Sequence, residues 1–138
     1  DMAEILEVRR IIEPEVVRAA AERHRPEDLA ALERNLAGLA AARDLPRISM
    51  LDAEFHDLVA AASRQSRLVQ AWNVFRGQFL LWIASSQRRL AIGTAEVRRT
   101  TLAGHREIIT LVGARDADGA GAFVREQLRQ AARVLGRP

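Results

Sequence analysis

The sequence predicts an all-α protein, an antiparallel bundle of six or seven helices, and three observations support that fold class. Alanine, leucine, arginine and glutamate dominate the composition, and all four favour helix. Apolar residues recur at spacings of three and four, and no segment alternates apolar and polar residues as a half-buried strand does. The breaks between the periodic segments are short, which favours antiparallel neighbours in a compact bundle.

The breaks divide the chain into six expected helices. They cover about 3–23, 26–42, 46–63, 67–89, 95–113 and 117–136. Pro14 interrupts the first helix and is expected to kink it. Pro26 suits the first turn of the second helix. Thr94 and Asp116 are expected N-caps of the fifth and sixth helices, and Gly113 is a C-terminal signal between them.

The fourth expected helix carries most of the aromatic mass of the chain. Trp72, Phe75, Phe79 and Trp82 follow a helical spacing, together with Ile83. A helix with this content lies at the centre of a bundle or forms a seam between subunits. The spacing leaves both positions open.

Size and charge narrow the classes of protein to consider. A chain of 138 residues forms one domain with a substantial core. Cysteine is absent, which excludes disulfides and thiolate metal sites and fits a cytoplasmic location. All 21 basic residues are arginine, and they are spread among acidic residues at a net charge of +3, unlike a nucleic-acid-binding stripe. No apolar run is long enough to span a membrane.

Four polar residues interrupt the apolar faces of three expected helices. Asp52 and His56, one turn apart, share a face with Ile48, Phe55 and Val59 on the third helix, and His105 and Gln127 lie on apolar faces of the fifth and sixth helices. A buried polar group needs a partner, and a carboxylate with two imidazoles is a plausible ligand set for a metal ion. The pattern predicts a polar site inside the bundle, although each residue taken alone also fits a structural hydrogen bond.

No catalytic signature accompanies these residues. The chain has no glycine-rich phosphate loop, no nucleophile-elbow serine and no His-Glu-x-x-His motif. We therefore expect a binding domain and not an enzyme. Two alternatives stay open, a metal-dependent hydrolase built on the same ligand set and a plain helical oligomerisation module.

Several segments together resemble the FadR-type C-terminal effector domain, called FCD, of GntR-superfamily bacterial transcription regulators. The most specific is 52–58, Asp-Ala-Glu-Phe-His-Asp-Leu. The others are 7–14, 18–21, 25–29, 65–68, 104–109 and 115–120. The resemblance covers nearly the whole chain.

The resemblance implies a ligand set and an effector. In metal-binding members, an aspartate and three histidines hold a divalent ion that helps to bind a small organic acid. Carried over by position, Asp52, His56 and His105 are the ligands of zinc or nickel, and Gln127 stands in place of the third histidine. Gln127, Arg9 and Arg76 are the candidate contacts to the effector.

The resemblance also implies partners outside the bundle. Members of the family carry an N-terminal winged helix-turn-helix domain that reads operator DNA, and their helical bundles dimerise, so the resemblance implies a homodimer. The chain begins with Asp1 inside sequence of effector-domain type, so we expect residues 1–138 to be the effector and dimerisation part of a longer regulator. Operator DNA is then a partner only through that N-terminal domain.

Overall fold

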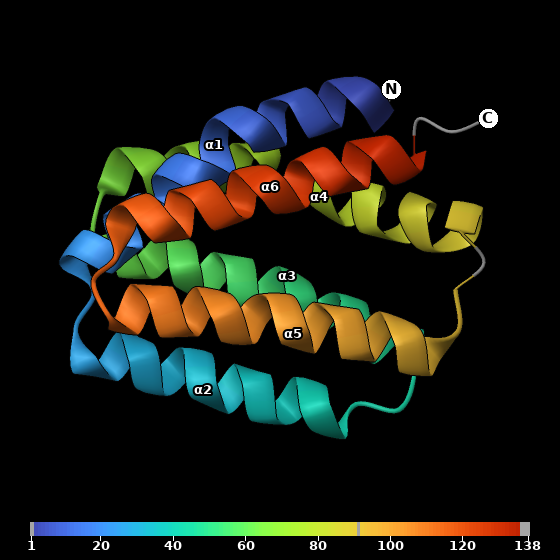
Figure 1. Ribbon diagram of the computed structural model, residues 1–138, viewed down its shortest axis with the longest axis horizontal. Helices are drawn as coiled ribbons and strands as arrows, with labels where there is room; N and C mark the ends of the chain where they lie inside the picture. The colour runs from blue at the N-terminus through green and yellow to red at the C-terminus, as the bar shows by residue number, and fades with distance from the viewer. Residues whose placement is uncertain (1, 91, 136–138) are drawn as a thin grey trace.

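The computed structural model describes residues 2–90 and 92–135, and these form a bundle of six helices without strands (Figure 1). The helices are α1 (Met2–Arg23), α2 (Pro26–Ala41), α3 (Leu45–Ala62), α4 (Ser66–Leu90), α5 (Thr94–Gly113) and α6 (Ala117–Leu135). The all-α prediction is confirmed. Of the six or seven helices predicted, the described residues form six. The expected end of the last helix at Gly136 lies outside them. No described helix has the length and apolar character needed to cross a membrane.

The helices enclose the third helix. α1 packs along α6, α2 packs along α3 and α5, and α4 packs against α1 and α3 (Figure 1). The main core is aromatic at its centre, where Phe55, Trp72 and Phe79 are almost fully buried. The inner face of α4 is therefore central to the bundle, as the spacing of its aromatic residues predicts. A second, smaller core cluster, which includes Leu39, Ile48 and Val97, joins α2, α3 and α5.

Local sequence signals set most of the helix boundaries. Pro26 is the first residue of α2, and the Asp44 carboxylate accepts a hydrogen bond from the backbone N–H of Arg47 at 2.8 Å, which caps α3. Asp116 caps α6 as predicted, by accepting from the N–H of Gly119 at 2.9 Å. The expected cap at Thr94 is wrong by one residue, because Gly93 holds the extended N-cap position of α5.

Pro14 lies inside α1 without breaking it. The helix is continuous from Met2 to Arg23, and Pro14 is buried among apolar neighbours. Proline has no N–H to donate to the preceding turn, so the helix loses one hydrogen bond there. Packing on α3, α4 and α6 keeps both halves helical.

Arg115 fastens the turn between α5 and α6 to the end of α1. Its guanidinium donates to the carbonyl oxygens of Ala21 at 3.4 Å, Glu22 at 3.0 Å and His24 at 3.1 Å. These are carbonyls at a helix C-terminus, where intrahelical partners run out. Arg115 itself has a φ of 57°, in the left-handed region, and this turn reverses the chain.

We predict that Arg115→Ala lowers the free energy of unfolding by about 1–2 kcal/mol, because the carbonyls at the end of α1 lose a charged donor. Both residues carry a Cβ, so the backbone cost at this φ stays the same. Urea denaturation followed by circular dichroism measures the change. Arg129→Ala is the matched control: Arg129 pairs with Glu126 on the surface of one helix, and the substitution should shift stability by less than about 0.5 kcal/mol. Equal effects of the two substitutions would contradict the role of Arg115.

Candidate functional site

Three of the predicted site residues meet inside the bundle. Asp52 and His56 project from successive turns of α3, and His105 reaches them from α5. One ligand atom from each of the three lies within 4.8 Å of the others. The Asp52 Oδ1 atom is 2.9 Å from Nε2 of His105 and 3.5 Å from Nε2 of His56. The spacing within α3 and the facing of α5 thus bring one carboxylate between two imidazoles.

Aromatic rings hold the two imidazoles in place. The His105 ring stacks on Phe55 with centroids 3.7 Å apart and planes 7° from parallel. The His56 ring meets His105 edge-on at 5.6 Å and lies 4.7 Å from Phe79. Nδ1 of His105 is buried and, among the described residues, has no hydrogen-bond partner. Stacking, and not a hydrogen bond at Nδ1, therefore orients this ring.

The environment shifts the pKa values of Asp52 and His105 in ways that favour a ligand set. Burial penalises the Asp52 charge, but hydrogen bonds from His105 and His56 outweigh it and hold the pKa of this carboxyl well below its ordinary value. Burial lowers the pKa of His105, against the opposing attraction of Asp52. At neutral pH the site therefore presents an ionised carboxylate and a neutral imidazole, which are the protonation states that bind a metal ion.

A buried ion pair forms another wall of the site. Arg9 and Glu13, one turn apart on α1, are 7% and 6% exposed, and Arg9 Nε donates to Glu13 Oε1 at 2.5 Å. The Arg9 guanidinium also lies over the rings of Trp82, at 4.1 Å, and Phe79, at 4.8 Å. Its Nη1 atom is buried without a hydrogen-bond partner among the described residues. Arg9 is thus fixed by Glu13 and still has one donor to offer.

Glu13 was not among the predicted site residues. It follows Arg9 by four positions and shares its buried face of α1 with Val16 and Val17. A carboxylate on an apolar face, one turn from an arginine, is the same signal that identified Asp52 and His56.

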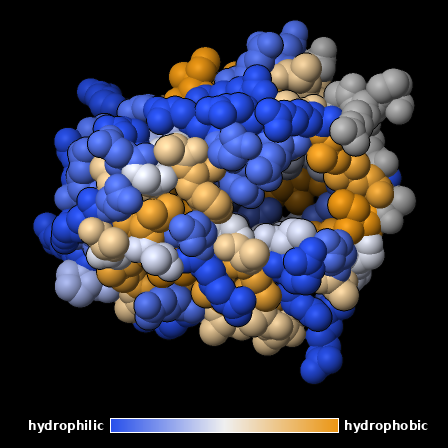
Figure 2. Space-filling model, in the orientation of Figure 1, coloured by the Kyte–Doolittle hydropathy of each residue, from blue (hydrophilic) through white to orange (hydrophobic). Residues whose placement is uncertain are grey.

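These side chains surround an open cavity of about 260 Å³ between α1, α3, α5 and α6. Figure 2 shows a hollow on this face, between the surfaces of α6 and α5, with hydrophobic atoms at its depth. The cavity is lined by Arg9, Glu13, Asp52, His56, Trp82, Thr100, Thr101, Gly104, His105, Ile108, Phe123, Val124, Gln127, Leu128 and Ala131. Polar groups thus converge in a mainly apolar cavity, which is the usual composition of a small-molecule site.

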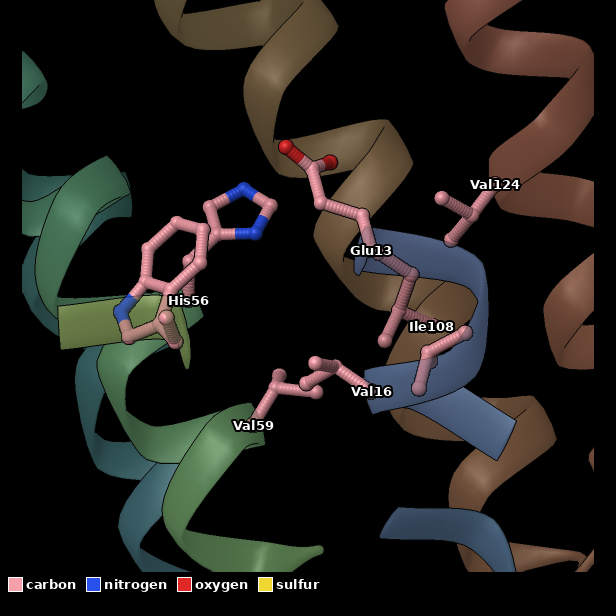
Figure 3. Close-up of a pocket in the computed structure, with 8 residues that line it drawn as sticks. Glu13, Val16, His56, Val59, Ile108 and Val124 are labelled. Atoms are coloured by element: carbon pink, nitrogen blue, oxygen red, sulfur yellow. The ribbon is translucent and has the colours of Figure 1, made fainter. Parts of the chain in front are cut away.

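The cavity has a small apolar extension beneath the charged groups. A void of about 20 Å³, close to the size of one water, lies between α1, α3, α5 and α6. Figure 3 shows the Glu13 carboxylate and the His56 ring at one end of it and Val16, Val59 and Ile108 at the other. Apolar side chains therefore pack against one side of the polar groups. They keep the local dielectric constant low, which strengthens the electrostatic interactions of the polar groups.

Gln127 lines the cavity with the other three residues, as predicted, but it is exposed, whereas Arg76 lies away from the cavity. Gln127 is exposed on α6 and lines the mouth of the cavity, where its Oε1 faces Gly104. Arg76 does not line the cavity: its Nε is 2.8 Å from Oδ1 of Asp57, which also accepts from Trp72 Nε1 at 2.7 Å. Asp57 is half-buried between α3 and α4. The structure therefore offers Arg9, and not Arg76, to a bound acid.

The donor set fits a divalent ion. An Asp oxygen and two imidazole nitrogens are three protein ligands from two rigid helices, and a site with three ligands keeps coordination positions open. The low pKa of Asp52 and His105 removes the proton competition that weakens such sites. The unpartnered Nδ1 of His105 is the weak feature, because metal-bound histidines usually donate from the second nitrogen.

The lowered pKa values predict that the ion-free protein loses stability as the pH falls. Between the folded and unfolded pKa values, the unfolded chain binds more protons, so stability increases with pH. For His105 this contribution is complete above its ordinary pKa of 6.5, and for Asp52 above 3.8. Thermal unfolding in the presence of a chelator, from about pH 8 to about pH 5, should show the decline. His105→Asn should flatten it; a midpoint that rises toward pH 5 would contradict the shifts.

Comparison with known proteins identifies the family. The FCD domain family matches residues 4–130. Among curated proteins, none matches the chain. Among solved structures, Streptococcus agalactiae GntR superposes with a TM-score of 0.77 over 96% of this chain, at 21% sequence identity, which shows a shared fold. The alignment spans 58% of the GntR chain. Because the family match covers most of its length, the chain belongs to the FCD domain family.

Proposed function

We propose that this domain senses a small organic acid for a bacterial transcription regulator of the GntR/FadR type, with a divalent metal ion at Asp52, His56 and His105. One observation carries the proposal: the three ligand atoms lie within 4.8 Å of one another in the wall of an open cavity of about 260 Å³. The same wall holds Arg9, whose Nη1 has no partner among the described residues.

The chemistry of the cavity suits a carboxylate. A zinc or nickel ion held by Asp52, His56 and His105 supplies positive charge and open coordination positions for an anion. Arg9 supplies a fixed guanidinium whose charge the surrounding rings do not screen. Glu13 occupies the Nε side of that guanidinium and directs the remaining donor elsewhere. An acid in this cavity would meet the metal ion, the guanidinium of Arg9, whose charge Glu13 offsets in part, and apolar side chains.

The position of the cavity supports a role in switching. Its lining residues come from α1, α3, α4, α5 and α6, so one ligand touches most of the bundle. A ligand that fits one packing of these helices better than another shifts the equilibrium between them. The shift is limited by the difference in affinity for the two packings.

The outer face of α4 supports a homodimer as the functional unit. Val74 and Leu81, two turns apart on this face, are 85% and 56% exposed. Large apolar side chains exposed at this spacing are typical of a face that another helix covers. In our proposal the dimer lies in the cytoplasm, and operator DNA contacts an N-terminal winged helix-turn-helix domain of the longer regulator.

Sensing accounts for the site better than the other two readings. A hydrolase needs a general base beside the metal-bound water, and the carboxylate of Glu13 is instead paired with Arg9. A plain oligomerisation module has no use for a cavity with unpartnered donors, which costs stability. A sensor domain requires a cavity with free donors, and it does not require Glu13 to act as a general base.

His105→Ala is expected to lower the affinity for zinc by at least tenfold, as is His56→Ala, because each removes one of three ligands. Elemental analysis of the purified protein and zinc titration calorimetry measure the loss. His24→Ala is the matched control, since this buried histidine follows α1 and bonds the carbonyl oxygen of Ala20 in that helix, away from the cavity. Circular dichroism checks that the variants stay helical. Wild-type zinc affinity in both site variants would refute the metal assignment.

Gln127→His is expected to tighten zinc binding, because an imidazole on α6 at the mouth of the cavity adds a stronger ligand than an amide. Zinc titration of the variant against the wild type gives the change. Gln130→His, on the same helix but outside the cavity lining, controls for the added imidazole. If both variants bind zinc equally, Gln127 does not face the ion.

A further inference from the structure

The cavity continues into a second chamber that lies farther from Arg9. This chamber has a volume of about 190 Å³ and lies between α3, the C-terminal half of α4 and the N-terminal half of α5. Asp52, Trp82, Thr100 and Thr101 line both chambers, so the two adjoin at these residues. Beyond them, Ile83, Leu90, Ile92 and Val97 make the second chamber mainly apolar.

Three polar side chains of the second chamber, Ser86, Gln87 and Thr100, already have hydrogen-bond partners within the protein. Ser86 donates to the carbonyl oxygen of Trp82 at 2.7 Å, and Gln87 is bonded to Ser49 at 3.0 Å. The Thr100 hydroxyl donates to carbonyl oxygens of its own helix. A hydroxyl or charged group of a ligand placed beside these three side chains would lose water while their donors stay occupied, which weakens binding.

The first chamber and the boundary between the two differ in this respect. The buried atoms Arg9 Nη1, His105 Nδ1 and Trp82 Nε1 have no hydrogen-bond partner among the described residues. Arg9 and His105 line the first chamber and not the second, and Trp82 lies at the boundary between the two. The free donors, Arg9 Nη1 and Trp82 Nε1, are thus in the first chamber and at the boundary, and the far chamber offers mainly apolar contact.

We propose that the effector is a monocarboxylic acid with an unbranched apolar tail of medium length. This inference rests on the proposed function, because its carboxylate occupies the first chamber beside Arg9 and the metal ligands. The tail passes Trp82 and fills the second chamber. Dicarboxylates and sugar acids are disfavoured, because their second carboxylate or their hydroxyls would enter the apolar chamber.

Calorimetric titration of the zinc-loaded protein with acetate, butyrate, hexanoate and octanoate tests the tail. Each methylene buried in the second chamber should raise the affinity about three- to fourfold, until the chamber is full and the gain stops. Adipate, which has the length of hexanoate with a second carboxylate, and gluconate should bind no more tightly than acetate.

Two substitutions on opposite walls test where the tail lies. Val97→Phe on α5 and Ser86→Leu on α4 each add volume to the second chamber only. Each should lower the ratio of hexanoate to acetate affinity by about tenfold or more. Val74→Phe is the matched control, because Val74 is exposed on the outer face of α4 and should leave the ratio unchanged. Circular dichroism identifies a variant that does not fold. In that case the affinity ratio of the variant on the opposite wall tests the position of the tail.

The outcomes separate this inference from the proposed function. Equal affinity for all four monocarboxylates, tighter binding of adipate or gluconate, or an unchanged ratio in a folded wall variant would overturn the inference while leaving an acid sensor in place. If no acid binds and His105→Ala does not change zinc affinity, the proposed function fails, and this inference fails with it.

Discussion

The hydrogen bond between His105 and Asp52 is the interaction on which the architecture of the site depends. It joins α5 to α3 inside the bundle, at 2.9 Å, where an unpaired charge would be costly. Asp52 stays ionised because two imidazoles surround it, and His105 stays neutral because it is buried. The stacking of His105 on Phe55 then sets the angle at which its ring meets the carboxylate. The contact between α3 and α5 is therefore enough to bring the three candidate metal ligands together.

The bundle balances this polar interior against a large aromatic core. Trp72, Phe55 and Phe79 are almost fully buried, and together with the aliphatic residues around them they supply most of the apolar area removed from water. That burial stabilises helices that also enclose a cavity and unpartnered donors. Proteins retain such features where binding requires them, because the cost is recovered when a ligand fills the space. The ion pair of Arg9 and Glu13 fits the same description, since it is buried at the edge of the cavity and not in the core.

Gln127 stands where the family resemblance implies a third histidine. This difference and the shape of the cavity both favour a metal site with open coordination positions. With an exposed amide at the mouth instead of an inward imidazole, the three close ligands come from α3 and α5, and α6 contributes only to the wall. An ion held by fewer protein ligands has more positions for an effector to occupy. Under the proposed function, the metal ion and the acid would then bind cooperatively, with the affinity for each depending on the other.

The sequence by itself determined the helices and the pairing within each helix. Periodicity, prolines and capping aspartates located the helices, and the four-residue spacing placed Asp52 beside His56, because these are properties of a single helix. Polar residues on apolar faces also identified His105 as a partner for this pair, and the family resemblance supported the three as a ligand set. Only the tertiary structure decided that Arg9 faces the cavity, that Asp57 binds Arg76 away from it, that Gln127 is exposed and that a second chamber exists. Those outcomes depend on how far each helix is rotated about its axis and how closely neighbours approach. Both are set by the joint packing of side chains from several helices, which no local spacing encodes.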